Sequence, residues 1–170
     1  GASTGTVLAA MTGAGNFGIG TSAPSKKLDV NGDALIYGVT VGRGAGAGSV
    51  NTVVGASALS GSNTGNANTA IGGYTLAGNT SGNYLTAVGY NALTANTTGT
   101  ENTAIGSGSA SIYSTMRYNT TGSYNTAVGN GSLANNTSAN YNTAVGYQAG
   151  YANTTGTGIT VIGNQAGINA

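Results

Sequence analysis

Residues 68–106 read NTAIGGYTLAGNTSGNYLTAVGYNALTANTTGTENTAIG, and a five-residue motif returns in them at a constant spacing of 17 residues. The motif consists of Asn or a larger apolar residue, then Thr, then Ala or Val, then Val or Ile, and finally Gly. Seven copies are found, starting at Asn51, Asn68, Leu85, Asn102, Asn125, Asn142 and Ile159. A fixed period of about 20 residues or slightly less is typical of stacked coils rather than of a globular enzyme.

The composition of the chain excludes several kinds of functional site. Its 170 residues include four Lys or Arg, three Asp or Glu, and neither His nor Cys. The chain therefore lacks the commonest general base, disulfides and thiolate metal ligands. A net charge of +1 argues against nucleic acid as a partner, because binding to phosphates needs a clustered basic surface. No run approaches the roughly 18 apolar residues of a membrane span. We expect no enzyme activity, no cofactor, no metal site and no membrane insertion.

One repeat is interpreted as strand, turn, second strand and second turn. Thr at the second motif position and Val or Ile at the fourth favour β-structure, and they share one face because strand side chains alternate. We interpret this face as the interior of the coil. The predicted core then comprises Thr69, Ile71, Thr86, Val88, Thr103, Ile105, Thr126, Val128, Thr143 and Val145. A second apolar anchor follows four residues after the Gly in four copies, at Leu59, Leu76, Leu93 and Leu133, whereas the last two copies have Gly150 and Gly167 there.

These patterns predict an all-β chain with two parts. Residues 1–50 form a short β-rich connector, and residues 51–170 form a parallel β-roll, or β-solenoid, with coils about 4.8 Å apart. The seven repeats span 51–67, 68–84, 85–101, 102–124, 125–141, 142–158 and 159–170. Each coil buries few side chains, which is a thin core against the conformational entropy lost on folding. We therefore expect exposed Ala, Leu and Tyr side chains to be covered by other copies of the chain.

The motif Asn-Thr-Ala-Val/Ile-Gly, followed by Ala-Leu, resembles the head repeats of trimeric autotransporter adhesins. It resembles even more the repeats of phage tail fibres and related bacterial trimeric fibre proteins. Residues 15–33, GNFGIGTSAPSKKLDVNGD, resemble the segment that precedes such repeats in fibres with a C-terminal self-cleaving chaperone, and residues 36–46 resemble the start of the roll. The resemblance implies an intertwined homotrimer that forms the shaft or head of an extracellular, cell-surface or virion-tail fibre. It also implies attachment to a host cell-surface glycan or protein.

The fourth repeat contains the most individual sequence of the chain. Residues 107–118 are six residues longer than their counterpart, residues 90–95, in the preceding repeat. Insertions in solenoids commonly leave the stack as loops, often on the binding face. We therefore expect residues 107–118 to protrude from the roll, and the candidate surface contact comprises Tyr113, Met116, Arg117 and Tyr118. A bulge without a partner is the alternative.

Three repeated columns have competing interpretations. The Thr column suits ice binding if it forms an exposed flat row, so a monomeric ice- or surface-binding β-solenoid is the second functional hypothesis. A Thr that points inward would instead bond to neighbouring strands. Asn79, Asn96, Asn119, Asn136 and Asn153 each begin an Asn-x-Ser/Thr triplet, which suits either glycosylation of a surface filament subunit or a turn that prefers Asn. Tyr74, Tyr84, Tyr90, Tyr124, Tyr141 and Tyr147 suit either sugar contacts or packing.

Overall fold

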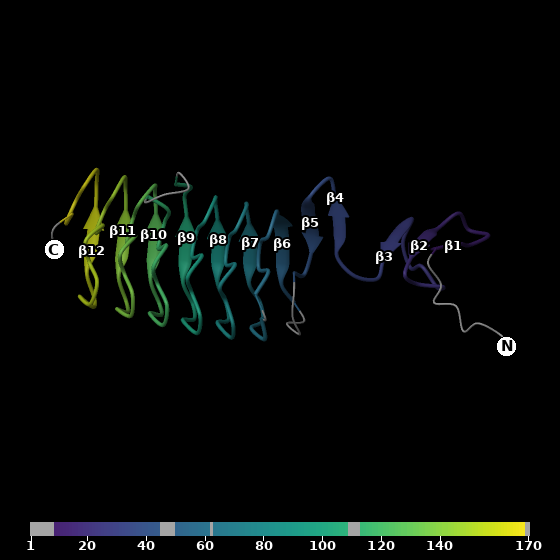
Figure 1. Ribbon diagram of the computed structural model, residues 1–170, viewed down its shortest axis with the longest axis horizontal. Coiled ribbons are helices and arrows are strands. Elements are labelled where there is room, and N and C mark those ends of the chain that lie inside the picture. The colour runs from purple at the N-terminus through teal and green to yellow at the C-terminus, as the bar shows by residue number, and fades with distance from the viewer. Residues whose placement is uncertain (1–8, 45–49, 62, 109–112, 169–170) are drawn as a thin grey trace.

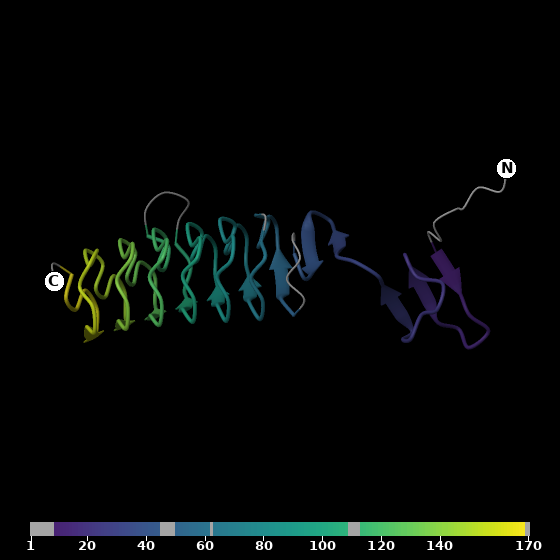
Figure 2. The ribbon, with the colours of Figure 1, turned by 90° about the horizontal axis from the view of Figure 1, so that it is seen from below.

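The computed structural model describes residues 9–44, 50–61, 63–108 and 113–168 (Figure 1). Within these ranges the chain forms strands and turns and no helix, so the predicted all-β class is confirmed. The molecule is elongated. The coils lie side by side along its longest axis, and the N-terminal strands continue beyond them, as the perpendicular view also shows (Figure 2).

The N-terminal part contains five short strands. β1 (Ala9–Met11), β2 (Phe17–Ile19) and β3 (Leu28–Val30) form a sheet of their own, with β1 antiparallel and β3 parallel to β2. β4 (Ala34–Ile36) and β5 (Val39–Gly42) form an antiparallel hairpin. β5 also pairs antiparallel with the first strand of the solenoid. The sheet of the solenoid therefore extends into the segment that the sequence assigned to the connector.

The solenoid contributes one strand from each coil. These strands are β6 (Thr52–Gly55), β7 (Thr69–Ile71), β8 (Thr86–Val88), β9 (Thr103–Ile105), β10 (Thr126–Val128), β11 (Thr143–Val145) and β12 (Thr160–Ile162). They pair in parallel and in register, so that Thr86 lies opposite Thr69 and Thr103. The longer fourth repeat keeps the register, because Thr103 pairs with Thr126. The predicted parallel β-solenoid is confirmed, with one coil per repeat.

The strand faces are the reverse of the prediction. Ala at the third motif position is fully buried, as in Ala87 and Ala104, whereas Ile71 is 39% and Ile105 is 40% exposed. The inward orientation predicted for Thr69, Ile71, Thr86, Val88, Thr103, Ile105, Thr126, Val128, Thr143 and Val145 is therefore wrong. The interior beneath β6 to β10 is already filled by Asn amides and by Leu or Met side chains. Only a side chain as small as Ala fits there in most coils, and Val53 takes its place in β6.

The segment after each strand is a turn and not the predicted second strand. Leu59, Leu76, Leu93, Met116 and Leu133 are fully buried or nearly so, and each has a positive φ between 46° and 53°. A left-handed backbone cannot continue an extended strand. These residues nevertheless link the coils, because Leu76 N donates to Ala92 O at 3.1 Å and Leu93 N to Thr115 O at 3.1 Å. The Leu anchor is thus confirmed as buried. The chain covers these Leu residues and the motif Ala residues by itself, so neither set needs another copy of the chain to cover it.

A ladder of buried Asn side chains runs through the interior from coil to coil. Asn96 Nδ2 donates to Asn79 Oδ1 at 2.8 Å, Asn119 Nδ2 to Asn96 Oδ1 at 2.9 Å, and Asn136 Nδ2 to Asn119 Oδ1 at 2.8 Å. Each of these Nδ2 atoms also donates to a turn carbonyl three residues later, as Asn96 does to Gly99 O at 3.0 Å. The amides therefore fill the interior with satisfied polar groups, as burial requires.

A second set of Asn side chains closes the coils at the first motif position. Asn68 Oδ1 accepts the backbone N–H of Leu85 in the next coil at 2.9 Å, and Asn68 Nδ2 donates to Gly82 O of its own coil at 2.9 Å. Asn125 is placed in the same way, accepting from Asn142 N at 2.9 Å and donating to Ala139 O at 2.8 Å. One side chain thus joins the two ends of a coil and binds it to the next.

The Gly at the end of each strand is required by both conformation and space. Gly89 has a φ of +128°, and a Cβ at this position would overlap the carbonyl oxygen of Gly106 in the next coil. Gly146 also has a positive φ, of +134°, and a Cβ there would overlap the carbonyl oxygen of Gly163. Both the positive φ and the close approach of another backbone restrict this position to Gly.

The Asn ladder can be tested with two neighbouring residues of the same type. Asn136→Ala should lower the free energy of unfolding by about 1–3 kcal/mol, because it leaves the buried Asn119 Oδ1 without its donor. Asn135→Ala is the matched control, since Asn135 is only partly buried, and it should cost no more than about 0.5 kcal/mol. Urea denaturation followed by circular dichroism measures both values. Equal stability of the two variants would show that the ladder does not stabilise the fold.

Candidate functional site

The outer face of the solenoid sheet presents three columns of side chains. In one coil they are Tyr84, Thr86 and Val88, while Leu85 and Ala87 between them are fully buried. The same alternation places the motif Thr and the motif Val or Ile outside in every coil from β7 to β12, and the residue before the motif, which precedes the strand, is also at least partly exposed. We call these the Tyr column, the Thr column and the Val/Ile column, and together they form the outer sheet face.

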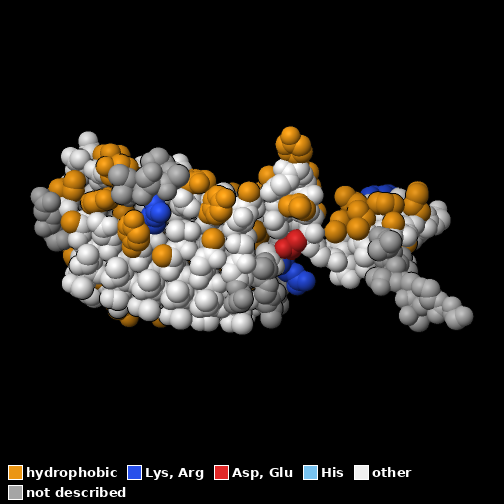
Figure 3. Space-filling view, in the orientation of Figure 1, with side chains coloured by type: hydrophobic (Ala, Val, Ile, Leu, Met, Phe, Trp, Pro, Cys, Tyr) orange, Lys and Arg blue, Asp and Glu red, His pale blue; other side chains and the backbone are white. Residues whose placement is uncertain are grey.

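The Val/Ile column gives the outer sheet face an apolar strip along the whole solenoid. Val54, Ile71 and Ile105 are 37–40% exposed, and Ile162 in the last coil is 71% exposed. Further large apolar side chains are exposed in the N-terminal strands, namely Met11, Phe17, Ile19, Leu28, Leu35, Ile36, Val39 and Val41. Figure 3 shows hydrophobic side chains in a broken row along the upper edge of the molecule, over both the solenoid and the N-terminal strands.

The Tyr column contains aromatic residues and one acid in consecutive coils: Tyr84, Glu101, Tyr124 and Tyr141. All four are exposed and have left-handed backbones with φ between 54° and 61°. Their backbone N–H groups donate to the preceding coil, as Glu101 does to Asn83 O and Tyr124 to Thr100 O, both at 3.0 Å. Equivalent backbone positions therefore stack in line, one coil apart.

Within this column the rings of Tyr124 and Tyr141 are stacked, with centroids 5.0 Å apart and planes inclined by 7°. The negative charge of Glu101 raises the pKa of the Tyr124 hydroxyl above its ordinary value. Partial desolvation of the hydroxyl, the neighbouring Tyr141 and the closeness of the Glu101 side chain act in the same direction. The carboxylate of Glu101 thus lies close to the outer end of the Tyr124 side chain.

Two other ring contacts lie outside the Tyr column. Tyr74 and Tyr90 meet edge to face with centroids 5.8 Å apart, and Tyr113 lies 6.0 Å from Tyr151 with an interplanar angle of 44°. Four of the six tyrosines named in the sequence analysis therefore form ring pairs, Tyr74 with Tyr90 and Tyr124 with Tyr141. Packing between coils explains these pairs, while the exposed ring surfaces stay accessible.

The predicted surface contact in the fourth repeat is only partly at the surface. Met116 is fully buried, so its assignment as a contact residue is wrong: it occupies the place of Leu93 in the core. Residues 114–118 are back in the coil, since Met116 N donates to Ser132 O at 3.0 Å and Tyr118 N to Ala134 O at 3.1 Å. The insertion is thus confined to residues 107–113, of which 109–112 lie outside the described residues.

The remaining three members of that candidate contact lie at or near the surface. Tyr113 is partly buried against Tyr151. The guanidinium carbon of Arg117 lies 5.3 Å from the ring centroid of Tyr118, which is 39% exposed. Counting back three residues from Asn119 would have identified Met116 from the sequence, because Leu76 and Leu93 stand three residues before Asn79 and Asn96.

The Asn residues of the five glycosylation triplets belong to the internal ladder. Asn79, Asn96, Asn119 and Asn136 are 0% and Asn153 is 2% exposed, and their Nδ2 atoms donate within the chain. Transfer of a glycan requires an accessible amide nitrogen. The folded coil therefore does not present these side chains for modification, and the interpretation as turn and core residues is the one that the geometry supports.

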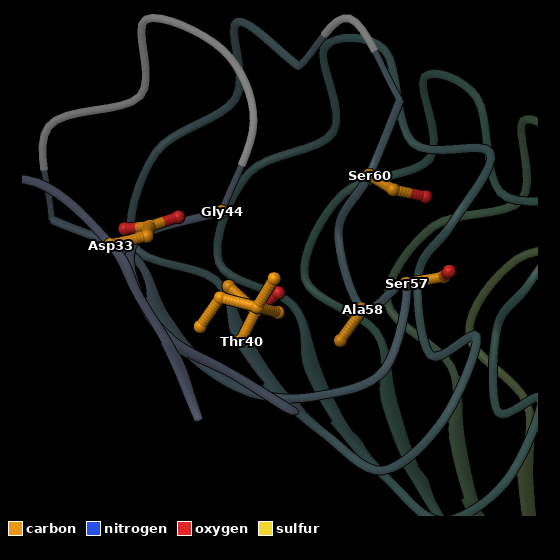
Figure 4. A pocket seen from close by; sticks show the side chains of 7 residues that line it. Asp33, Thr40, Gly44, Ser57, Ala58 and Ser60 are labelled. Carbon is orange, nitrogen blue, oxygen red and sulfur yellow. The ribbon is translucent and has the colours of Figure 1, made fainter. Parts of the chain in front are cut away.

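A hollow of about 320 Å³ lies beside the β4–β5 hairpin and the first coil (Figure 4). Asp33, Thr40, Gly44, Ser57 and Ser60 are among its lining residues. Asp33 Oδ1 accepts the backbone N–H of Arg43 at 2.6 Å, so the carboxylate holds the hairpin. Because this acid already has a structural partner and no second titratable group lines the hollow, the outer sheet face is the stronger candidate site.

Comparison of the chain with known protein families, curated proteins and solved structures finds no match. In the part of the chain that the structure describes, no three His, Cys, Asp or Glu residues lie together in a way that could hold a metal ion. The described residues also contain no helix long and apolar enough to span a membrane. Function must therefore be inferred from the outer sheet face itself.

Removing the insertion tests how the fourth coil is built. Deletion of residues 107–112 restores a 17-residue spacing between Asn102 and Asn125 and leaves Thr115 and Met116 at their buried positions. Thermal stability should stay within a few degrees of the parent, because loop length changes closure entropy only weakly. A melting curve measures this. A large loss of stability would mean that the deleted residues contribute to the core.

Proposed function

We propose that this chain is a structural segment, shaft or head, of a trimeric extracellular or virion-tail fibre used for attachment to a cell surface. The observation that carries the proposal is the Val/Ile column, which is apolar in every coil and points away from the chain's own core. Monomeric soluble proteins rarely expose long contiguous apolar surfaces, so a partner is expected to cover it.

A second copy of the chain is the partner that matches this surface best. The exposed Val and Ile side chains repeat at the coil spacing of about 4.8 Å. Another copy offers apolar groups at the same period and can meet them coil for coil over the full length. Near-absence of charge suits such an interface, since residues 51–170 contain only Glu101 and Arg117 as charged side chains. The number of three copies is taken from the resemblance to trimeric fibre proteins.

The apolar residues of the N-terminal strands support the same proposal. Met11 is 76% exposed in the separate three-stranded sheet, and Leu35 and Ile36 are 74% and 62% exposed in β4, at the edge of the solenoid sheet. Isolated three-stranded sheets need a covered hydrophobic face to be stable. Association of copies would cover these side chains together with the Val/Ile column, and would yield a stiff rod whose length follows from the number of coils.

Solution mass tests the proposed assembly. The chain should sediment at three times its mass of 16.2 kDa. The double variant Ile105→Asp/Val128→Asp should dissociate it while keeping the β-type circular dichroism spectrum, because a carboxylate buried at an interface without a partner costs about 3–5 kcal/mol. Thr121→Asp/Ser138→Asp is the control, since it adds the same charges at exposed turn positions of the same coils. A parent chain that sediments as a monomer would contradict the proposal.

The outward Thr column favours a second candidate, ice or surface binding by a single chain. This hypothesis needs Thr86, Thr103 and their equivalents in an exposed row, and the structure turns the whole column outward beside the Val/Ile column. The fibre remains the preferred proposal, because a fibre interface also accounts for the exposed apolar residues of the N-terminal strands, which ice binding by the Thr column does not.

An ice-recrystallisation assay separates the two candidates. For a fibre segment, we expect the parent chain to be inactive. If the chain binds ice, Thr103→Tyr/Thr126→Tyr should abolish the activity by breaking the flat row, whereas Thr137→Tyr on an exposed turn should not. Clear activity of the single chain with this pattern of variants would replace the fibre proposal.

A further inference from the structure

The Tyr column contains a juxtaposition that neither the fibre nor the ice-binding hypothesis uses. Glu101 is the only acidic residue after Asp33 in the sequence, and it stands one coil from Tyr84 on one side and one coil from Tyr124 on the other. Equivalent positions in other coils hold Tyr141, Ala67 and Gly158. The single carboxylate of the repeat region is thus placed between two exposed aromatic side chains.

The geometry points to a binding site for a quaternary ammonium group, formed by Tyr84, Glu101 and Tyr124. Two coil steps separate the backbones of the two tyrosines by about 9.6 Å, so a cation seated over the Glu101 carboxylate has a tyrosine about 4.8 Å away along the solenoid axis on either side. Attraction between a cation and an aromatic face is effective within about 6 Å of the ring centroid. The coil spacing of a parallel solenoid therefore sets the two tyrosine positions at a separation that suits one compact organic cation.

The backbone of the site is rigid before any ligand arrives. Tyr84, Glu101 and Tyr124 have φ values of 56°, 54° and 61°, and each N–H is bonded to the preceding coil at 3.0 or 3.1 Å. Tyr141 covers one face of the Tyr124 ring in a nearly parallel stack. Because the stack is close to one coil step, the opposite face of Tyr124 is turned toward the coil of Glu101. Little ordering is thus left for binding.

Charge also favours a cation at this place. The carboxylate of Glu101 is exposed, and its charge raises the pKa of the Tyr124 hydroxyl. A guanidinium group would need a two-pronged pairing with this carboxylate, close to the Tyr124 hydroxyl whose pKa it already raises. A quaternary ammonium group carries no N–H donors and needs only the two ring faces and the nearby negative charge. Its methyl groups also gain dispersion contacts with the rings.

The site is compatible with assembly through the Val/Ile column. Tyr84 precedes β8 and Val88 ends it, so the Tyr column and the Val/Ile column lie at opposite ends of the strands. The Tyr column can therefore stay open at the margin when copies pack on the apolar strip. All three residues of the site belong to one chain, so the site is the same in a single chain and in an assembly of copies.

Choline chloride is the probe for the test, added to the complete chain at constant ionic strength. We expect saturable binding. It is measured by the change in tyrosine fluorescence or by transfer of magnetisation from the protein to the choline methyl protons. Glu101→Gln, Tyr84→Ala and Tyr124→Ala should each weaken binding by at least about fivefold. Tyr147→Ala is the matched control, because Tyr147 is 47% exposed but stands outside the column, and it should bind as the parent does.

Further variants and ligands distinguish loss of the binding site from loss of stability and from binding of other ligands. Tyr124→Phe retains the ring and should retain binding, even if an Ala variant is less stable. Arginine amide should bind more weakly than choline, and so should neutral oligosaccharides. Absence of saturable choline binding, binding unchanged in Glu101→Gln, or tighter binding of arginine amide would each overturn the inference. Oligosaccharide binding that requires Tyr141 and not Glu101 would identify a sugar platform in its place. The solution mass, measured separately, decides the fibre proposal whatever the result here.

Discussion

Hydrogen bonds between buried Asn amides are the interaction on which the architecture of the solenoid depends. Each amide donates to the Asn of a neighbouring coil and to a turn of its own coil, so it fixes the stacking and the cross-section together. If one coil changed its register by a single residue, an Asn would leave the interior and two amides would lose their partners, at a cost of about 1–3 kcal/mol for each unsatisfied group. This penalty explains why the period is kept through the fourth repeat despite its insertion.

The period alone predicts the coil, the parallel register and the Gly corners, because each follows from repetition and backbone chemistry. The orientation of the strand could not be predicted in the same way. Alternation in Thr-Ala-Val shows that two faces exist, and apolarity then favours the Val face as interior. Here Asn96 and Leu93 already occupy the interior, and only Ala104 and its equivalents fit beside them. The restriction of the third position to Ala or Val was the sequence signal for this arrangement.

The candidate site was likewise predictable only in part. The repeats place Thr103 and Tyr124 in columns, but the outward orientation of Thr103 follows from the reversed strand, and Tyr124 is exposed on the left-handed turn that precedes the strand. The role of Glu101 depends on which residues lie one coil away, and sequence neighbours such as Thr100 do not reveal it. Met116, in contrast, falls within residues 107–118, which the length of the fourth repeat predicts to protrude. Its spacing from Asn119 was sufficient to place it in the core.

Contacts in the solenoid connect a coil to its immediate neighbours, and each coil presents the same backbone groups on both sides. In-frame duplication or loss of 17 codons in the gene would therefore lengthen or shorten the rod by about 4.8 Å while leaving every remaining junction as it was. Unequal recombination between the near-identical repeats can produce such changes in one event. The reach of the rod is thus heritable in discrete steps, and selection can adjust it without altering a single core residue.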